Sequence, residues 1–452
     1  MLSLIFQSSK FYLSFKTLKS KKEIYKEYIM ALSNSTRTHI LDPTVFNSSR
    51  AEFRLDNNLY ITNLVLANVG VSCAGVDGKQ TGLYYNSVNG VLACIRKLSL
   101  FSGSTLIDEI QELQAYGSIQ HLKTSNQGSE DLNRFDLLNG CNASISGADG
   151  NLTTMPTNKD YTASYDIQAD VGQVLRHNDQ IQVTKDSDRG STGLLVVANY
   201  LQFLQSVQVL PGIENLRLVI EWNNDINDWY VDGAAPANPG NPVVVVMRPQ
   251  LVFTEILNMK VQDTVKLPFT SNFVERFQVP AVAEGSSKFQ SFRSGAFRQR
   301  YVQNLTLFNQ ANANDGWFLK PSRSVAQIGE VIQLIWNGRK YLPDQGCNTP
   351  AMKLRYFNDT MGSLNVPLAS AMAGLVDVVD SKYNLFDYKA AKLTHNFSVG
   401  AFAINDTCDR LDIEITRVGG ANTDQKDPYT LIVFGQVSRL LTIYKGVVTL
   451  SY

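Results

Sequence analysis

The chain has 452 residues, which is enough for two or three domains that each bury a core. Charged residues make up 18% of it, below the roughly 25% of an average soluble protein. Lys and Arg together number 41, as do Asp and Glu, so no overall field favours a nucleic-acid partner. This composition suits a large β protein with polar loops, or one whose surface is largely covered by neighbours. No run approaches the roughly 18 apolar residues that span a bilayer.

The first 29 residues differ in amino-acid composition from the rest of the chain. They open with MLSLIF, which is too short for the apolar core of a signal peptide and has no basic segment before it. A stretch rich in Lys and aromatic residues follows. Three interpretations stay open: a flexible basic arm facing a genome or membrane, a helix that docks on a partner, or translated sequence upstream of a start at Met30. We expect residues 1–48 to form an N-terminal arm that is flexible or partly absent from the mature chain.

Strand-like patterns begin at residue 49. Residues 53–71 carry large apolar side chains at nearly alternate positions among polar ones, as strands with one buried face do. Seven to nine such segments, joined by turn residues, are expected in each half of the chain. The alternation of strands and helices that marks a parallel sheet is absent. Antiparallel sandwiches and jelly rolls are the packed solution for this pattern.

A hairpin pattern occurs twice in the chain. Residues 332–344, IQLIWNGRKYLPD, place Asn337-Gly338 between β-forming runs, and this pair tolerates the positive φ of a two-residue hairpin turn. Arg339 and Lys340 leave the return strand ambiguous. Residues 97–108, KLSLFSGSTLID, have the same layout. The alignment sets Phe101 against Trp336, Gly103 against Gly338, and Leu106 against Tyr341.

A second pattern also occurs twice. Residues 215–222 and 410–418 alternate apolar and mostly polar side chains, and each segment precedes a loop and then a strongly apolar strand. The spacing differs between the halves, so we interpret the match as an old structural duplication and not as a solenoid repeat. The predicted organisation is the arm at residues 1–48, a first jelly roll with long inserted loops at residues 49–260, and a second jelly roll at residues 261–452.

A few segments do not fit the strand pattern. Residues 109–193 are polar and broken by Gly, Asn and Asp, which indicates elaborated loops at one end of a β scaffold. A short helix is expected within residues 107–122 and another within residues 367–393. Residues 193–212 fit either a helix or a buried strand, because periodicity does not separate the two.

Motifs for catalysis and metal binding are nearly absent. The chain has no P-loop, no nucleophile elbow and no zinc-protease motif. Cys408 lies beside Asp406 and Asp409 with no basic neighbour to activate it, and residues 185–190 lack the ligands of a Ca²⁺ loop. We therefore predict no catalytic residue, no metal site and no cofactor. The isolated residues are the histidines His39, His121, His177 and His395, and the cysteines Cys73, Cys94, Cys141, Cys347 and Cys408, expected to be reduced.

Residues 288–304 combine cations with aromatic side chains. Such a mixture can stack bases and bind phosphates. The alternative is a twisted strand pair around Ser294-Gly295 with aromatic residues inward and arginines outward, and we favour this alternative. Contact of this stretch with nucleic acid stays an open question. Its cations are Lys288, Arg293, Arg298 and Arg300, and its aromatic residues are Phe289, Phe292, Phe297 and Tyr301.

Most of residues 50–452 resembles the major capsid proteins of Polinton-like viruses and virophages. The segments that carry the resemblance are FRLDNNLYITNLVLANVGV, YYNSVNGVLACIRKLSLFSGSTLIDE, VLPGIENLRLVIEW and the closing LLTIYKGVVTLSY. The likeness lies in the order and texture of segments. Residues 1–29 fall outside it, and residues 111–193 match only as a variable insertion.

The resemblance implies a double jelly roll of two eight-stranded sandwiches. It further implies a homotrimeric, pseudo-hexameric capsomer of an icosahedral double-stranded DNA virus, with long loops facing outward. The implied partners are neighbouring capsomers, penton and minor capsid proteins, and a non-specific contact with the genome or an internal membrane. The implied place is the virion shell, assembled inside the infected cell. The alternative is a jelly-roll viral attachment or carbohydrate-binding protein. A metal-dependent jelly-roll enzyme is disfavoured because no pair of histidines is available.

Overall fold

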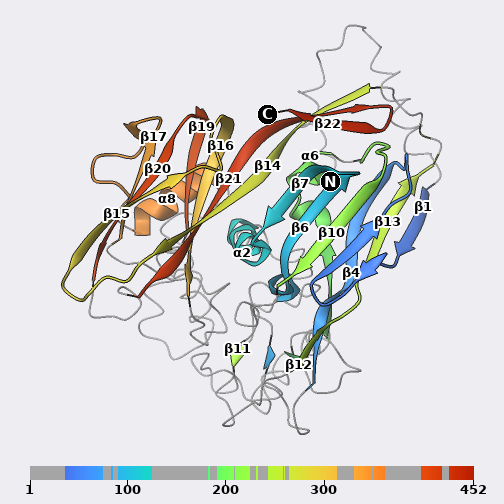
Figure 1. The fold of residues 1–452 in the computed structure, drawn as a ribbon, viewed down its shortest axis with the longest axis horizontal. Helices are drawn as coiled ribbons and strands as arrows, with labels where there is room; N and C mark the ends of the chain where they lie inside the picture. Colours follow the sequence, from blue (N-terminus) through green and yellow to red (C-terminus); the bar gives the residue numbers. More distant parts are fainter. Residues whose placement is uncertain are drawn as a thin grey trace.

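The computed structural model describes antiparallel strands arranged as two sandwiches that lie side by side (Figure 1). This confirms the predicted all-β class. The described residues are 36–74, 83–84, 90–124, 182–183, 191–207, 209–223, 231–232, 243–257, 259, 264–312, 330–347, 350–361, 399–419 and 427–451.

The first roll consists of two sheets. In one sheet β13 and β12 pair in succession with one edge of β4, β9 pairs with its other edge, and β1 pairs with the free edge of β13. In the other sheet the order is β2-β3-β10-β6-β7. The strands are β1 (Thr36–Leu41), β2 (Val45–Phe46), β3 (Arg50–Arg54), β4 (Ile61–Ala74), β6 (Ile95–Ser102), β7 (Thr105–Gln111), β9 (Ser191–Val196), β10 (Leu216–Trp222), β12 (Val243–Val246) and β13 (Gln250–Ile256).

The second roll repeats this arrangement. One sheet has the order β14-β21-β16-β19, with β22 also on β21, and the other has the order β15-β20-β17-β18. The strands are β14 (Thr264–Val279), β15 (Ser287–Ser294), β16 (Arg300–Ala311), β17 (Val331–Trp336), β18 (Arg339–Lys340), β19 (Val399–Cys408), β20 (Leu411–Val418), β21 (Tyr429–Tyr444) and β22 (Val447–Ser451).

The two rolls correspond strand by strand. The eight strands β14 to β21, taken in chain order, occupy the places of β1, β3, β4, β6, β7, β9, β10 and β13 in the first roll. Strand β10 lies between β3 and β6, as β20 lies between β15 and β17. Both central strands turn alternate apolar side chains inward. The duplication inferred from the sequence therefore holds at the level of strands.

The residue alignment of the two hairpins was wrong by one position. The ladders pair Ser102 with Leu216 and Trp336 with Leu411, so Ser102, and not Phe101, corresponds to Trp336. The second turn has positive φ at both central residues, Asn337 (50°) and Gly338 (79°), as predicted. The first turn places Gly103 (56°) and Ser104 at its centre and has a register shift between Leu100 and Phe101. Gly103 is thus the first and Gly338 the second central residue of its turn, so an alignment that matched the two glycines was displaced by one residue.

Strands β14 and β21 join the two rolls. They pair along their full length, from Thr264 opposite Tyr444 to Val279 opposite Tyr429. Leu431 and Val433 lie in the core of the second roll, whereas Leu441 and Ile443 lie in a core shared with the first roll. The ribbon pair therefore crosses from one sandwich to the other (Figure 1).

The helices and loops partly match the expectations. The helix expected within residues 107–122 is α2 (Leu113–Thr124). Residues 193–212 form both elements that the pattern allowed, strand β9 and the short helices η5 (Val197–Asn199) and α6 (Gln202–Ser206). Helix α8 (Pro350–Met361) was not predicted, and the expected helix at residues 367–393 lies outside the described residues. A further helix, η3 (Gly90–Cys94), precedes β6.

Three loop segments of the first roll meet in a small sheet of order β11-β5-β8. They come from distant parts of the sequence, namely β5 (Leu83–Tyr84), β8 (Gln182–Val183) and β11 (Val231–Asp232). Their meeting fits the expectation of elaborated loops at one end of the scaffold.

The start of the first roll differs from the expected boundary at residue 49. Strand β1 lies inside the range 1–48, yet it pairs with β13 from Thr36 opposite Ile256 to Leu41 opposite Leu251. These residues complete a sheet and do not form an arm. Residues 1–35 lie outside the described part. Between the rolls, β13 ends at Ile256 and β14 begins at Thr264, and the expected boundary at residues 260 and 261 falls in this interval.

Candidate assembly interface

The second roll places the outward face of one sheet against the first roll. Phe434 of β21 packs on Tyr116 of α2, with ring centroids 5.7 Å apart. Phe269 of β14 meets Phe203 of α6 edge-on, with centroids 5.1 Å apart. Figure 1 shows α2 between the two sandwiches. These contacts form one continuous apolar core, so the two rolls are held at a fixed angle to each other.

A buried carboxyl group lies at the centre of this contact. Asp108 of β7 is 1% exposed and accepts hydrogen bonds from the backbone N–H of Phe203 (2.9 Å) and the hydroxyl of Ser271 on β14 (2.5 Å). Burial raises the pKa of Asp108 to about 6, although the hydrogen bonds and the nearby Arg439 oppose that rise. Asp108 therefore links elements of both rolls and titrates near neutral pH.

Other polar groups cross the same boundary. Arg276 of β14 donates to Glu112, which follows β7, at 2.9 Å. Arg439 of β21 donates to the backbone carbonyl of Ile107 at 2.9 Å. Such polar pairs at a packed contact fix direction as well as contact, because each donor must meet its acceptor. This part of the interface thus specifies one orientation of the rolls.

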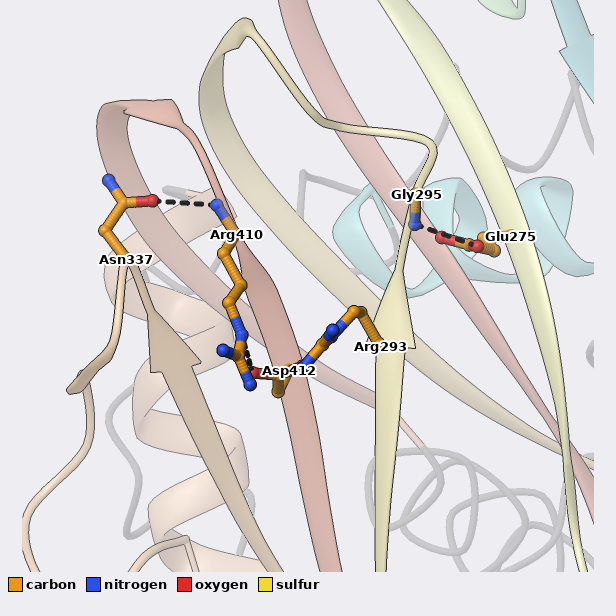
Figure 2. A network of polar contacts seen from close by, with 6 residues as sticks. All are labelled: Glu275, Arg293, Gly295, Asn337, Arg410 and Asp412. Carbon is orange, nitrogen blue, oxygen red and sulfur yellow. Dashed lines mark hydrogen bonds and ion pairs between the residues drawn. The ribbon is translucent and has the colours of Figure 1, made fainter.

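The predicted Asn-Gly hairpin lies at one end of the second roll, where it is tied to the next turn (Figure 2). The side-chain oxygen of Asn337 accepts from the backbone N–H groups of Asp409 (2.8 Å) and Arg410 (3.1 Å). Its side-chain amide donates to the carbonyl of Thr407 at 2.8 Å. The residue that permits the turn therefore also fastens it to the turn between β19 and β20.

A carboxylate between two arginines lies beside this turn. Asp412 of β20 is 5% exposed and accepts from Arg293 of β15 (3.0 Å) and Arg410 (2.5 Å), as Figure 2 shows. Burial alone would raise the pKa of Asp412, but the hydrogen bonds from the two guanidinium groups outweigh burial and hold it below its usual value. The first roll has a similar group, in which Glu52 contacts Arg54 (3.0 Å) and Arg217 (3.5 Å).

The link between β15 and β16 is held by Glu275 of β14. Its carboxylate accepts from the hydroxyl of Ser294 and from the backbone N–H of Gly295 (3.2 Å) and Ala296 (3.4 Å). The link joins one sheet to the other, because β15 pairs with β20 while β16 pairs with β19 and β21. The expected strand pair around Ser294-Gly295 was therefore wrong: the two segments belong to different sheets.

The cations of residues 288–304 have different surroundings. Arg293 binds Asp412, and Arg300 lies over the ring of Phe273 with its guanidinium carbon 3.8 Å from the centroid. Lys288 and Arg298 are exposed. The aromatic residues are divided as well, because Phe297 is fully buried while Phe289 is 60% exposed. The structure does not gather them on one surface, so a shared nucleic-acid site gains no support.

Among the described side chains, Cys408 and His39 have the surroundings of structural residues. Burial, together with Asp409 and Asp406, raises the pKa of the Cys408 thiol to about 11, which agrees with the predicted inert thiol. His39 stacks on Phe253 and contacts Glu255 at 2.7 Å. Within the described residues, no group of three metal-binding side chains occurs and no helix is long and apolar enough to cross a membrane.

Sequence reasoning missed the importance of Asp108. Both hairpins have an aspartate after the turn, and the pattern treated Asp108 and Asp344 as the same acidic end. In the structure Asp108 is buried between the rolls, whereas the Asp344 side chain is 92% exposed. The one available signal was the position of Asp108 between Ile107 and Ile110 in a strand with apolar residues.

Comparison with known proteins identifies the architecture. No family model and no curated protein matches the chain. Among solved structures, PBCV-1 VP54 fitted into a reconstruction of the virophage Sputnik has a TM-score of 0.55 at 10% identity, covering 97% of this chain and 99% of that one. The fold is the double jelly roll of viral major capsid proteins.

Two further structures share the double jelly roll. A chain of the Sputnik virophage structure has a TM-score of 0.54 at 12% identity, covering 92% of this chain and 88% of that one. The mavirus major capsid protein has a TM-score of 0.52 at 10% identity, covering 92% of this chain and 90% of that one. The resemblance to virophage capsid proteins that the sequence suggested is thus matched by structure at very low identity.

Proposed function

We propose that the chain is a structural major capsid protein that forms homotrimeric, pseudo-hexameric capsomers of an icosahedral double-stranded DNA virus of the Polinton-like or virophage type. The observation that carries this proposal is the pair of corresponding rolls joined by a rigid contact. Two similar sandwiches at a fixed angle make one third of a ring with near-sixfold outline. The low charge content supports the same conclusion, because permanent interfaces are depleted in charged residues.

The role is mechanical and not enzymatic. Turns fastened by Asn337 and Glu275 make one end of the second roll rigid, and the shared core fixes the angle between the rolls. The work of such a protein is to tile a surface, and its loops are free to vary. The proposed partners are copies of the chain, together with penton and minor capsid proteins in the virion shell. Assembly in the host cell and contact with a genome or membrane belong to the same proposal.

Light scattering during gel filtration, followed by negative-stain microscopy, tests the function. The expected result is a particle of three times the mass of the chain with a hexagonal outline and a central depression. An obligate interface of this kind buries on the order of 2,000 Å² or more. A monodisperse monomer at micromolar concentration would overturn the capsomer proposal. A monomer that also bound glycans on an array would favour the attachment or carbohydrate-binding alternative.

A further inference from the structure

A row of aliphatic side chains crosses the outward face of the first roll. Ile40 of β1 pairs with Val252 of β13, Val252 pairs with Val65 of β4, and Val65 pairs with Val196 of β9. Ile40 is 63% exposed and the other three side chains are partly exposed. We call these four residues the aliphatic row. It is an apolar stripe on a sheet face that no described element covers.

The direction of these side chains follows from the strand period. In β13, β4 and β9 the residues beside the row point into the core of the first roll, because successive side chains alternate between faces. The side chains of the aliphatic row therefore point away from the core of the first roll. The buried neighbours are Leu64 and Leu66 on β4, Leu251 and Phe253 on β13, and Leu195 at the end of β9.

The corresponding face of the second roll is covered within the chain. Phe434 and Ile432 of β21 and Phe308 of β16 point outward there, and all three are buried in the core shared with the first roll. Strands β14, β21, β16 and β19 take the places of β1, β13, β4 and β9. One of the two equivalent faces is thus covered within the chain, whereas no described element covers the other, which carries the aliphatic row.

The contact between the rolls uses different surfaces on its two sides. The second roll contributes a sheet face, and the first roll contributes β7, α2 and α6. Among the described residues, one surface of each kind has no counterpart within the chain. These are the row-bearing face of the first roll, and the side of the second roll that consists of β18 and the exposed face of α8, whose other face packs on β19 and buries Phe357. A contact between unlike surfaces of different copies is heterologous, and it builds a ring where the rotation between copies closes.

We propose that the aliphatic row is the centre of the contact with a second copy of this chain and packs against the β18 and α8 side of its second roll. This inference rests on the proposed capsomer and names the surface that closes it. A row of threonines beside the aliphatic row, Thr38 opposite Thr254 and Thr254 opposite Thr62, provides a polar border. An apolar centre with a polar rim is the usual anatomy of a stable interface.

The double variant Val65→Glu with Val252→Glu tests the surface. Both changes place carboxylates on an outward face, so the chain is expected to keep its β-sheet circular dichroism while the trimer dissociates at a concentration at least tenfold higher. The matched control is Phe289→Glu, since Phe289 is 60% exposed on β15, at the opposite edge of its sheet from β18. The control is expected to remain trimeric.

A photo-reactive phenylalanine analogue at position 40 tests the partner without disturbing the sheet. Cross-links from position 40 to residues 331–361 of a second chain are the expected result. Cross-links to the first roll of another copy, or to residues 1–35 of the same chain, would overturn the proposed partner. If the wild-type chain is trimeric and the double variant is also trimeric, the surface is wrong while the function stands. A monomeric wild-type chain overturns both.

Discussion

At the scale of single residues, buried carboxylates divide into two kinds. Asp412 and Glu52 each lie between two guanidinium groups, and their pKa values are lowered. Asp108 accepts hydrogen bonds from neutral donors and has Arg439 nearby, but burial outweighs them and its pKa is raised. Burial raises the pKa in all three cases, and the direction of each shift depends on whether the hydrogen bonds and charges of the neighbours outweigh it.

Replacing Asp412 tests the contribution of its two arginine partners. The variant Asp412→Ala removes two charge-assisted hydrogen bonds, so we expect the free energy of unfolding to fall by about 2 kcal/mol. The pKa of Asp412 is lowered in the folded chain, so its contribution is present above the pKa of the unfolded chain and is lost as the pH falls below about 4. Urea denaturation at pH 7 and at pH 3 measures both effects.

The matched control is Asp344→Ala. Asp344 contacts Lys340 at 3.1 Å, but the pair is exposed, so its loss is expected to change the unfolding free energy by less than about 0.5 kcal/mol. Equal effects of the two substitutions would contradict the stabilising role assigned to Asp412.

At the scale of elements, hydrogen bonds between two turns hold one end of the second roll together. Asn337 stabilises the turn in two ways. It adopts the positive φ that the turn requires, and its side chain forms three hydrogen bonds with residues 407–410. The two-residue strand β18 follows, so the hairpin is secured by its tip more than by its ladder. The hairpin was predicted correctly from Asn-Gly because a turn depends on local conformation. The side-chain hydrogen bonds of Asn337 were not predicted, because their partners lie 70 to 73 residues away in the sequence.

Two substitutions at position 337 separate the contribution of the side-chain hydrogen bonds from that of the positive φ. The variant Asn337→Gly keeps the positive φ and loses the side-chain bonds, so we expect a loss of about 1 to 2 kcal/mol. The variant Asn337→Ala also strains the backbone and is expected to cost about 1 kcal/mol more. Denaturant midpoints give the two values, and hydrogen exchange at the Arg410 amide, which loses its acceptor in both, is expected to quicken. Identical stability of the two variants would show that backbone strain is not involved.

At the scale of the whole molecule, the two rolls behave as one body because their contact shares a core and buried polar groups. Among the described groups of this contact, Asp108 is a buried carboxyl whose pKa is raised to about 6. Arg439 lies nearby, and the pair of Glu112 with Arg276 lies on the same boundary. Protonation of Asp108 neutralises a buried carboxylate whose charged form is disfavoured by burial.

The pH dependence of folding tests this role of Asp108. Its folded pKa of about 6 exceeds its unfolded value of about 4, so the folded chain binds the proton more tightly between these values. The stability due to this group is therefore largest below pH 4 and decreases by about 3 kcal/mol as the pH rises through 6. The difference in unfolding free energy between the wild-type chain and Asp108→Asn, measured from pH 4 to pH 7, is expected to show this slope. A difference that is constant with pH would refute the assignment.

The sequence by itself determined the class of fold, the hairpins and the duplication, because these follow from the alternation of side chains and from turn residues that act over a few positions. The alternating patterns of residues 215–222 and 410–418 are an example, since these segments form the central strands β10 and β20. Only the tertiary structure decided the contact between the rolls, the burial of Asp108 as opposed to Asp344, and the open aliphatic row. Each of these depends on which sheet face meets another, and pairing of residues far apart in the chain leaves no local pattern.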